Sequence, residues 1–151
     1  MAQSFGCFPL PVLFLLLTAT SCWFLESSGF DDAAGGQISV AWAIRNRVLD
    51  GKAKSWWGEG YAGVCLKPYQ FSCWNKNDPN YPYLSCAKPI PSKQLTQAQR
   101  AADLVISGAE PDITKGATHY YATTMPKAPA WAKDATQTFR LGDHIFFKDV
   151  P

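Results

Sequence analysis

Residues 36–49, GQISVAWAIRNRVL, constrain the fold more than any other segment of this chain. Apolar residues recur there at the three- and four-residue spacing of an amphipathic helix: Val40, Ala41, Ile44 and Val48. Arg45 and Arg47 lie near the C-terminal end, where cations interact favourably with the helix dipole, and Gly51 follows as a stop signal. We therefore predict a helix with one face in the core of a domain.

The remaining segments predict a second helix, several strands and long loops. Residues 96–108 repeat the helical pattern, residues 117–123 predict a strand, and residues 138–147 predict two strands joined by a Gly-Asp turn. Between the helices, residues 52–91 carry many aromatic residues among Gly, Pro and Asn, and a loop this long is usually functional. Aromatic side chains can bind sugars, because their flat rings cover the apolar faces of pyranoses. Most of the aromatic residues in this segment are nevertheless expected to pack onto the core. The expected fold class is α+β, with a few helices and a small antiparallel sheet.

The chain of 151 residues is long enough for one domain, which we assign to residues 26–151. A net charge of +2 and the lack of a Lys/Arg run argue against binding to nucleic acid. The five Cys residues include Cys65 and Cys73, the expected pair in an oxidising compartment, with unpaired thiols as the alternative. No pair of C-x-x-C motifs occurs, which argues against a structural zinc site.

Residues 8–25 form an uncharged apolar run that has three interpretations. A secretory signal peptide fits its apolar centre and the small residues that follow, although no Lys or Arg precedes it, and a lipidated Cys22 is a variant of this interpretation. A membrane anchor would be near the lower limit of length. A buried first helix is the third. We favour the signal or anchor for residues 1–25, which predicts a secreted or cell-envelope protein and membrane contact through this segment.

Cysteine and metal chemistry have little support in the residues. The segment Ser72-Cys73-Trp74 resembles the nucleophile segment of papain-type proteases, but the preceding Gly and Cys are absent. Cys73 with His119 or His144 stays open as a peptidase pair. Those two His residues are too far apart in sequence for an H-x-x-x-H metal motif, and no spacing favours a zinc amidase. We expect no metal and no cofactor.

A carboxylic acid is the third kind of catalytic group, because cleavage of a glycosidic bond needs an acid to protonate the leaving oxygen. Most Asp and Glu residues fall in polar loops, whereas Glu26 follows Trp23-Phe24-Leu25. If that apolar segment packs into the domain, desolvation raises the pKa of Glu26 and keeps it protonated. If the segment is a signal or an anchor, Glu26 is only a polar residue beside it.

Four segments, in order, resemble the SleB-type cell wall hydrolases. They are QISVAWAIRNRV (37–48), VCLKPYQFSCWN (64–75), GATHYYATTMPKAPAWA (116–132) and RLGDHIFF (140–147). The resemblance implies a small domain related to lysozymes and lytic transglycosylases. It also implies peptidoglycan as the partner and substrate, cut between N-acetylmuramic acid and N-acetylglucosamine. We expect the enzyme to be a monomer.

The resemblance further implies individual site residues. The family's general acid is a Glu in an E-A-R-G-E-like segment before the first helix, and Glu26 lies in the nearest match, ESSG. The Arg of that motif is missing, and Phe30 or the nearby Asp31 and Asp32 replace its second Glu. Three explanations fit: a displaced but working Glu26, an inactive relative, or an altered N-terminus. The residues expected to bind substrate are Gln70, Phe71, Ser72, His119, Tyr120 and Tyr121.

In the implied lytic transglycosylase route, Glu26 acts first as acid and then as base, and a 1,6-anhydro sugar forms. Hydrolysis would instead need a second carboxylate, for which Asp31 or Asp32 could serve. Strand alternation directs only one of Tyr120 and Tyr121 towards the substrate, and His144 is assigned to structure. Two other classes of function stay open: an amidase or peptidase that cuts the stem peptide, and an inactive wall-binding relative.

Overall fold

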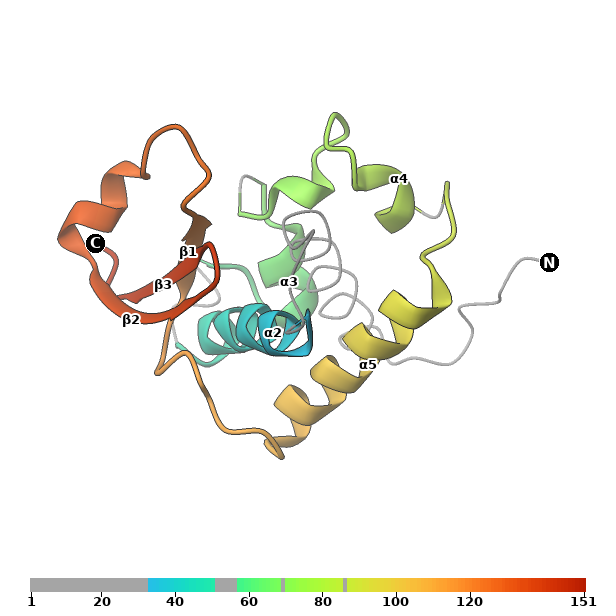
Figure 1. Ribbon diagram of the computed structural model, residues 1–151, viewed down its shortest axis with the longest axis horizontal. Coiled ribbons are helices and arrows are strands. Elements are labelled where there is room, and N and C mark those ends of the chain that lie inside the picture. Colours follow the sequence, from blue (N-terminus) through green and yellow to red (C-terminus); the bar gives the residue numbers. More distant parts are fainter. Residues whose placement is uncertain (1–32, 51–56, 69, 86) are drawn as a thin grey trace.

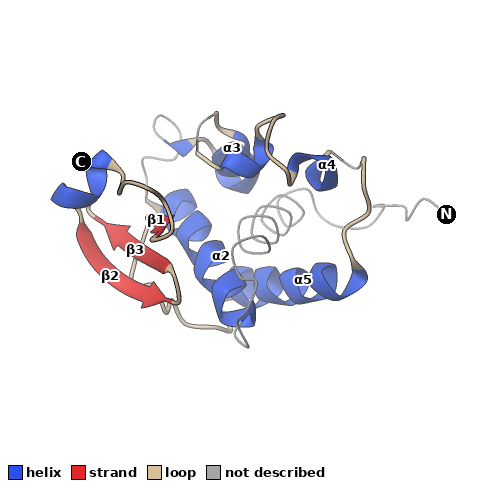
Figure 2. Ribbon diagram, turned by 45° about the horizontal axis from the view of Figure 1, so that its top comes forward, coloured by secondary structure: helices blue, strands red, loops and turns tan. Residues whose placement is uncertain are grey.

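The computed structural model describes most of the chain, namely residues 33–50, 57–68, 70–85 and 87–151. The N-terminal run, Glu26 and the predicted domain boundary before it lie outside these ranges. Within them, helices form the first part of the fold, and the C-terminal third forms a small sheet at one side of the helices (Figure 1). The same division is plain when the molecule is turned (Figure 2). The predicted α+β class is confirmed.

Helix α2 (Ala33–Leu49) is the central element and contains the predicted helix. Val40 and Ile44 are fully buried, as the periodicity of the sequence requires. Helix α5 (Ser92–Ser107) packs across α2 and begins four residues before the predicted start. It ends at Gly108, whose φ of 74° is the left-handed conformation that favours glycine at this position.

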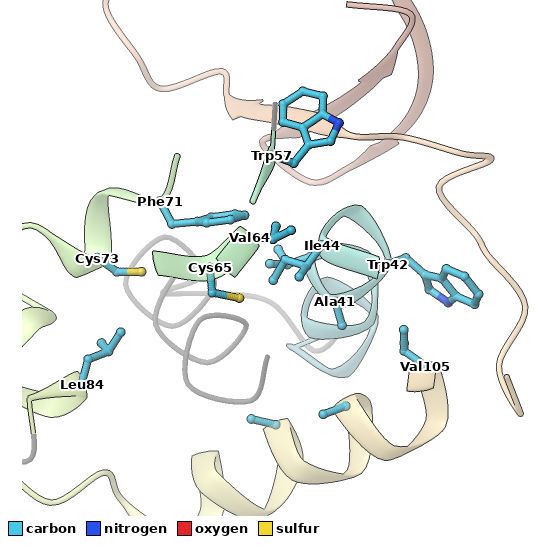
Figure 3. Packing of buried hydrophobic residues seen from close by; sticks show 13 residues of the cluster. Ala41, Trp42, Ile44, Trp57, Val64, Cys65, Phe71, Cys73, Leu84 and Val105 are labelled. Carbon is cyan, nitrogen blue, oxygen red and sulfur yellow. The ribbon is translucent and has the colours of Figure 1, made fainter. Parts of the chain in front are cut away.

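The main hydrophobic core lies between α2, α5 and the short helices that connect them (Figure 3). Helix α3 (Gly60–Leu66) contributes Val64 and Cys65, and the single turn η2 (Ser72–Trp74) contributes Cys73. Cys65 and Cys73 are not joined in a disulfide, so the predicted pair is wrong. Both side chains instead act as small apolar groups that fill the core.

Residues 52–91 are less irregular than predicted, because the described part holds α3, η2 and α4 (Tyr81–Leu84). These helices have seven, three and four residues, too short for an apolar pattern to repeat. Each buries side chains in the main core, such as Leu84 of α4. Packing, rather than local preference, therefore decides that this region forms helices.

The sheet has three antiparallel strands in the order β1-β3-β2. They are β1 (His119–Ala122), β2 (Thr136–Leu141) and β3 (His144–Lys148), and all three predicted strands are confirmed. Phe146 of β3 is fully buried and forms a second core cluster with Ala43 of α2 and Ala117. This cluster attaches the sheet to the central helix.

The turn before β1 is held by one carboxylate. Asp112 accepts hydrogen bonds from the backbone N–H of Thr114 (2.9 Å) and of Gly116 (2.8 Å). The Nδ2 of Asn46, on α2, donates to the other side of this turn, at 2.9 Å to Asp112 Oδ2 and 2.9 Å to the carbonyl of Ala117. The start of β1 is therefore fixed to α2 by polar contacts as well as by the core.

Across the described ranges, no helix combines the length and the apolar character that a membrane span requires.

Candidate functional site

Arg47 is the centre of a polar network that joins segments distant in sequence. Its side chain is 5% exposed. The Nε atom donates to the carbonyl oxygen of Thr118 at 2.6 Å, and Nη1 donates to Oε1 of Gln70 at 2.5 Å. The guanidinium carbon lies 4.8 Å from the ring centre of Trp57 and 5.0 Å from that of Phe71. One buried cation therefore touches the loop at 70, the segment at 57 and the start of β1.

Trp57 is fixed from several sides. Its indole Nε1 donates to Oδ2 of Asp50 at 2.9 Å, and its carbonyl accepts from Nε2 of Gln70 at 2.9 Å. Gly58 follows with a φ of 100°, and a Cβ at that position would collide with the carbonyl of Gly63. Glycine is required there, because the backbone approaches α3 too closely for a side chain.

The imidazole of His119 lies between two indoles. Its ring centre is 5.0 Å from that of Trp57 and 4.9 Å from that of Trp131, which belongs to the turn η3 (Ala130–Asp134). The hydroxyl of Thr118 is 3.0 Å from its Nδ1. Burial lowers the pKa of His119 to about 4, and the positive charge of Arg47 adds to this effect. The ring is therefore neutral at ordinary pH, with one nitrogen that donates and one that accepts.

One side of the sheet carries an aromatic face, which consists of His119, Tyr121, Trp131 and Phe147. Tyr121 stacks on Phe147 with ring centres 5.6 Å apart and an angle of 14°, and Trp131 contacts both rings edge-on. Tyr120 lies on the other face, where its ring is 5.3 Å from that of Phe146. The expectation that one tyrosine points inward is confirmed: Tyr120 packs against the core, and Tyr121 belongs to the face with His119.

The structure brings only some of the predicted site residues together. Gln70 and His119 meet through Arg47 and Trp57, and Tyr121 lies on the same aromatic face as His119. Phe71 is 4% exposed and belongs to the main core, so its side chain anchors the loop at 70 to the core. The side chain of Ser72 and all of Glu26 lie outside the described part of the chain.

The sequence interpretation missed three contributors to the site: Arg47, Trp57 and Trp131. A signal for Arg47 was present, because it follows Ile44 by three positions and Val40 by seven, which places it on the buried stripe of the helix. An Arg on that stripe needs acceptors inside the domain. No local sequence pattern indicates that Trp57 and Trp131 belong to the site, because their positions depend on tertiary packing.

The two histidines lie on opposite faces of the sheet. His119 is opposite Phe147, and His144 is opposite Ala122, so their registers differ by three positions. Side chains three positions apart along a strand point to opposite faces, and His144, 2% exposed, packs against Tyr120. They cannot share one metal ion. In the described residues, no group of three His, Cys, Asp or Glu side chains could hold one.

Cys73 is 1% exposed in the main core (Figure 3). A thiol that is buried in the core is out of reach of a peptide substrate. This position does not favour the Cys-His peptidase alternative.

We expect the depressed pKa of His119 to make folding stability pH-dependent. An unfolded His takes up a proton near pH 6.5, whereas the folded ring resists protonation until about pH 4. Acidification across this window therefore favours the unfolded chain, and stability falls as the pH falls. Because the ring is partly exposed, the loss is on the order of 1–2 kcal/mol rather than the full value that the shift implies.

Urea unfolding of the wild type and of His119→Gln at pH 7 and pH 4.5 measures this effect. The carboxylates titrate in both proteins, so the difference between the two losses of unfolding free energy isolates the contribution of His119. The wild type should lose more stability than the variant on acidification. Equal losses, or an NMR titration of His119 near pH 6.5, would contradict the prediction.

Comparison with known proteins agrees with this architecture. The model of a family described as Cell Wall Hydrolase matches residues 31–147. The catalytic domain of the germination-specific lytic transglycosylase SleB from Bacillus anthracis is similar in structure, with a TM-score of 0.61, 22% identity, and coverage of 95% of this chain and 98% of that chain. The catalytic domain of the SleB protein from Bacillus cereus gives a TM-score of 0.60 and 22% identity, with coverage of 98% of each chain. No curated protein matches the chain.

The structural similarity confirms the predicted fold, a small α+β domain like the two SleB catalytic domains. The family match spans most of the sequence and includes α2, the loop at 70 and the whole aromatic face of the sheet. The chain therefore belongs to the cell wall hydrolase family.

Proposed function

We propose that the protein is a peptidoglycan-degrading enzyme that cleaves the glycan strand between N-acetylmuramic acid and N-acetylglucosamine. The observation that carries this proposal is the match of residues 31–147 to the cell wall hydrolase family. The shared fold with catalytic domains, one of them described as a lytic transglycosylase, supports the choice of the glycan over the stem peptide. A substrate of this kind lies outside the cytoplasm, which agrees with a secreted or envelope location.

The aromatic face of the sheet supports a carbohydrate substrate. Trp131 and Tyr121 present flat rings beside His119, and flat rings cover the apolar faces of pyranoses. Nδ1 of the neutral imidazole is 3.0 Å from the Thr118 hydroxyl, which leaves Nε2 for one hydrogen bond to a sugar hydroxyl or acetamide. In this proposal His119 and Tyr121 contact substrate, and Gln70 holds the loop through Arg47 and the Trp57 carbonyl.

In the proposed reaction Glu26 supplies the proton. Its carboxyl group protonates the glycosidic oxygen as the bond from that oxygen to C1 of N-acetylmuramic acid breaks. The resulting carboxylate then accepts the proton of the C6 hydroxyl, while the C6 oxygen bonds to C1. The products are a 1,6-anhydro sugar and a free N-acetylglucosamine end, and Glu26 regains its proton. No water is consumed.

Product analysis tests this function directly. Peptidoglycan is incubated with the full-length protein, and separately with a form lacking residues 1–22, and the soluble fragments are identified by mass spectrometry. We expect fragments that end in 1,6-anhydro-N-acetylmuramic acid. Reducing-end saccharides would keep glycan cleavage but replace the transglycosylase route by hydrolysis. Free stem peptides would overturn the proposal in favour of an amidase, and the absence of fragments in favour of an inactive wall-binding relative.

A further inference from the structure

We propose that Arg47 is a positioning residue of the active site, which holds the Gln70 loop, Trp57 and the start of β1 in one arrangement. The inference rests on the proposed function and goes beyond it, because it assigns a role to a buried side chain of α2. Arg47 acts through the residues it holds and does not itself contact the substrate.

Arg47 links two segments that are distant in the sequence. The acceptors of Arg47 are the Gln70 amide oxygen and the Thr118 carbonyl, which are 48 residues apart in the sequence. Thr118 directly precedes His119, and its N–H donates to the Phe147 carbonyl at 2.9 Å. A shift of the guanidinium would therefore move the loop at 70 and the strand that carries His119.

The contacts of Arg47 require a guanidinium group. A guanidinium is planar, donates through a rigid fork and stacks on aromatic rings, whereas an ammonium is a compact point charge. Arg47 uses both properties, since it donates in two directions and lies over Trp57 and Phe71. Burying a cation costs free energy, and removing its partners costs more. Lysine at this position would keep the positive charge but lose the planar pair of N–H donors that reaches both acceptors.

Arg47 also acts on His119 through its charge. The charge of Arg47 opposes protonation of His119, in addition to the larger effect of burial. The other charged groups on the segments packed around His119 have mixed signs: Asp50, Lys133, Asp134, Arg140 and Lys148. Lys133 and Asp134 are 3.8 Å apart and mostly exposed, so they largely offset one another. Arg47 is the buried charge in this set, which gives it a separate, measurable effect on His119.

Arg45 offers a matched control on the same helix. Its guanidinium carbon lies 4.9 Å from the ring centre of Trp42, and its Nη1 donates to the carbonyls of Val105 and Ile106 at the end of α5. The contacts are of the same kind as those of Arg47, a ring and backbone carbonyls. They join α2 to α5 instead of joining parts of the site. Loss of Arg45 therefore reports the purely structural value of such an anchor.

The experiment compares Arg47→Met, Arg47→Lys and Arg45→Met in the full-length protein. For each variant, melting temperature, the NMR-determined pKa of His119, and kcat and KM for release of glycan fragments are measured. Arg47→Met should raise the pKa of His119, because a positive charge is removed. It should also lower kcat by roughly a hundredfold, since small displacements of binding groups are costly. Arg47→Lys should keep the low pKa of His119 and still lower kcat. Arg45→Met should lower the melting temperature only.

Three outcomes would overturn the inference: a wild-type kcat in folded Arg47→Lys, an unchanged pKa of His119 in folded Arg47→Met, or an equal loss of kcat in Arg45→Met. If Arg47→Met does not fold, Arg47→Lys decides the question. If the wild type releases no fragments, the proposed function fails separately. The pKa of His119 in Arg47→Met does not depend on activity and then still tests the electrostatic effect of Arg47 on this face.

Discussion

Replacing Glu26 by Gln is expected to lower glycan cleavage by a factor of roughly 10²–10⁴, the usual contribution of a general acid. The amide is nearly isosteric with the carboxyl group but can neither protonate the glycosidic oxygen nor accept the C6 hydroxyl proton. Binding to peptidoglycan should be unchanged, because the proposed contacts with the sugar come from the sheet. The loss should therefore appear in kcat, measured from the rate of anhydro-fragment release.

Asp103→Asn is a suitable control, because it makes the same chemical change at an exposed position on α5. It should leave both kcat and the melting temperature unchanged. If Glu26→Gln retains wild-type activity, the acid lies elsewhere, and Asp31→Asn and Asp32→Asn are the next variants to measure. If all three remain active, the proposed mechanism is wrong even though the family assignment stands.

The largest loss of stability is expected for Phe146→Ala, at about 3–5 kcal/mol, because truncating a buried aromatic residue leaves a cavity. Phe146 is fully buried, and its ring lies 5.3 Å from that of Tyr120 and 5.8 Å from that of Phe139. It also contacts Ala43 and Ala117, which belong to α2 and to the segment before β1. The cavity would open where the sheet attaches to the helices.

Chemical unfolding of Phe146→Ala and of Met125→Ala measures this loss. Met125 is 47% exposed in the loop after β1, so its truncation should change stability by less than about 0.5 kcal/mol. Phe146→Ala should also raise KM, since β1 and β3 carry the aromatic face. A cost below about 1 kcal/mol would show that the cluster around Phe146 is not a principal link between sheet and helices.

The helical and strand elements with a regular pattern were predictable from local sequence. Helix α2 was recognisable from Val40 and Ile44, and the hairpin of β2 and β3 from its Gly142-Asp143 turn, because these signals depend on neighbouring residues. The short helices α3 and α4 were not predictable in this way, since fewer than two turns leave no repeat to read. The disulfide between Cys65 and Cys73 was predicted wrongly, because spacing in sequence does not fix where two sulfurs point.

For the candidate site, the sequence by itself determined which residue types were available, the family to which the chain belongs, and the segments that carry Gln70, His119 and Tyr121. Only the tertiary structure decided how these segments meet. Trp57 and Gln70 are 13 residues apart, Thr118 follows much later in the chain, and the three come together around one buried guanidinium. The physical reason is that a buried cation must find its acceptors wherever the fold places them. No local pattern records which distant carbonyl or amide will satisfy Arg47.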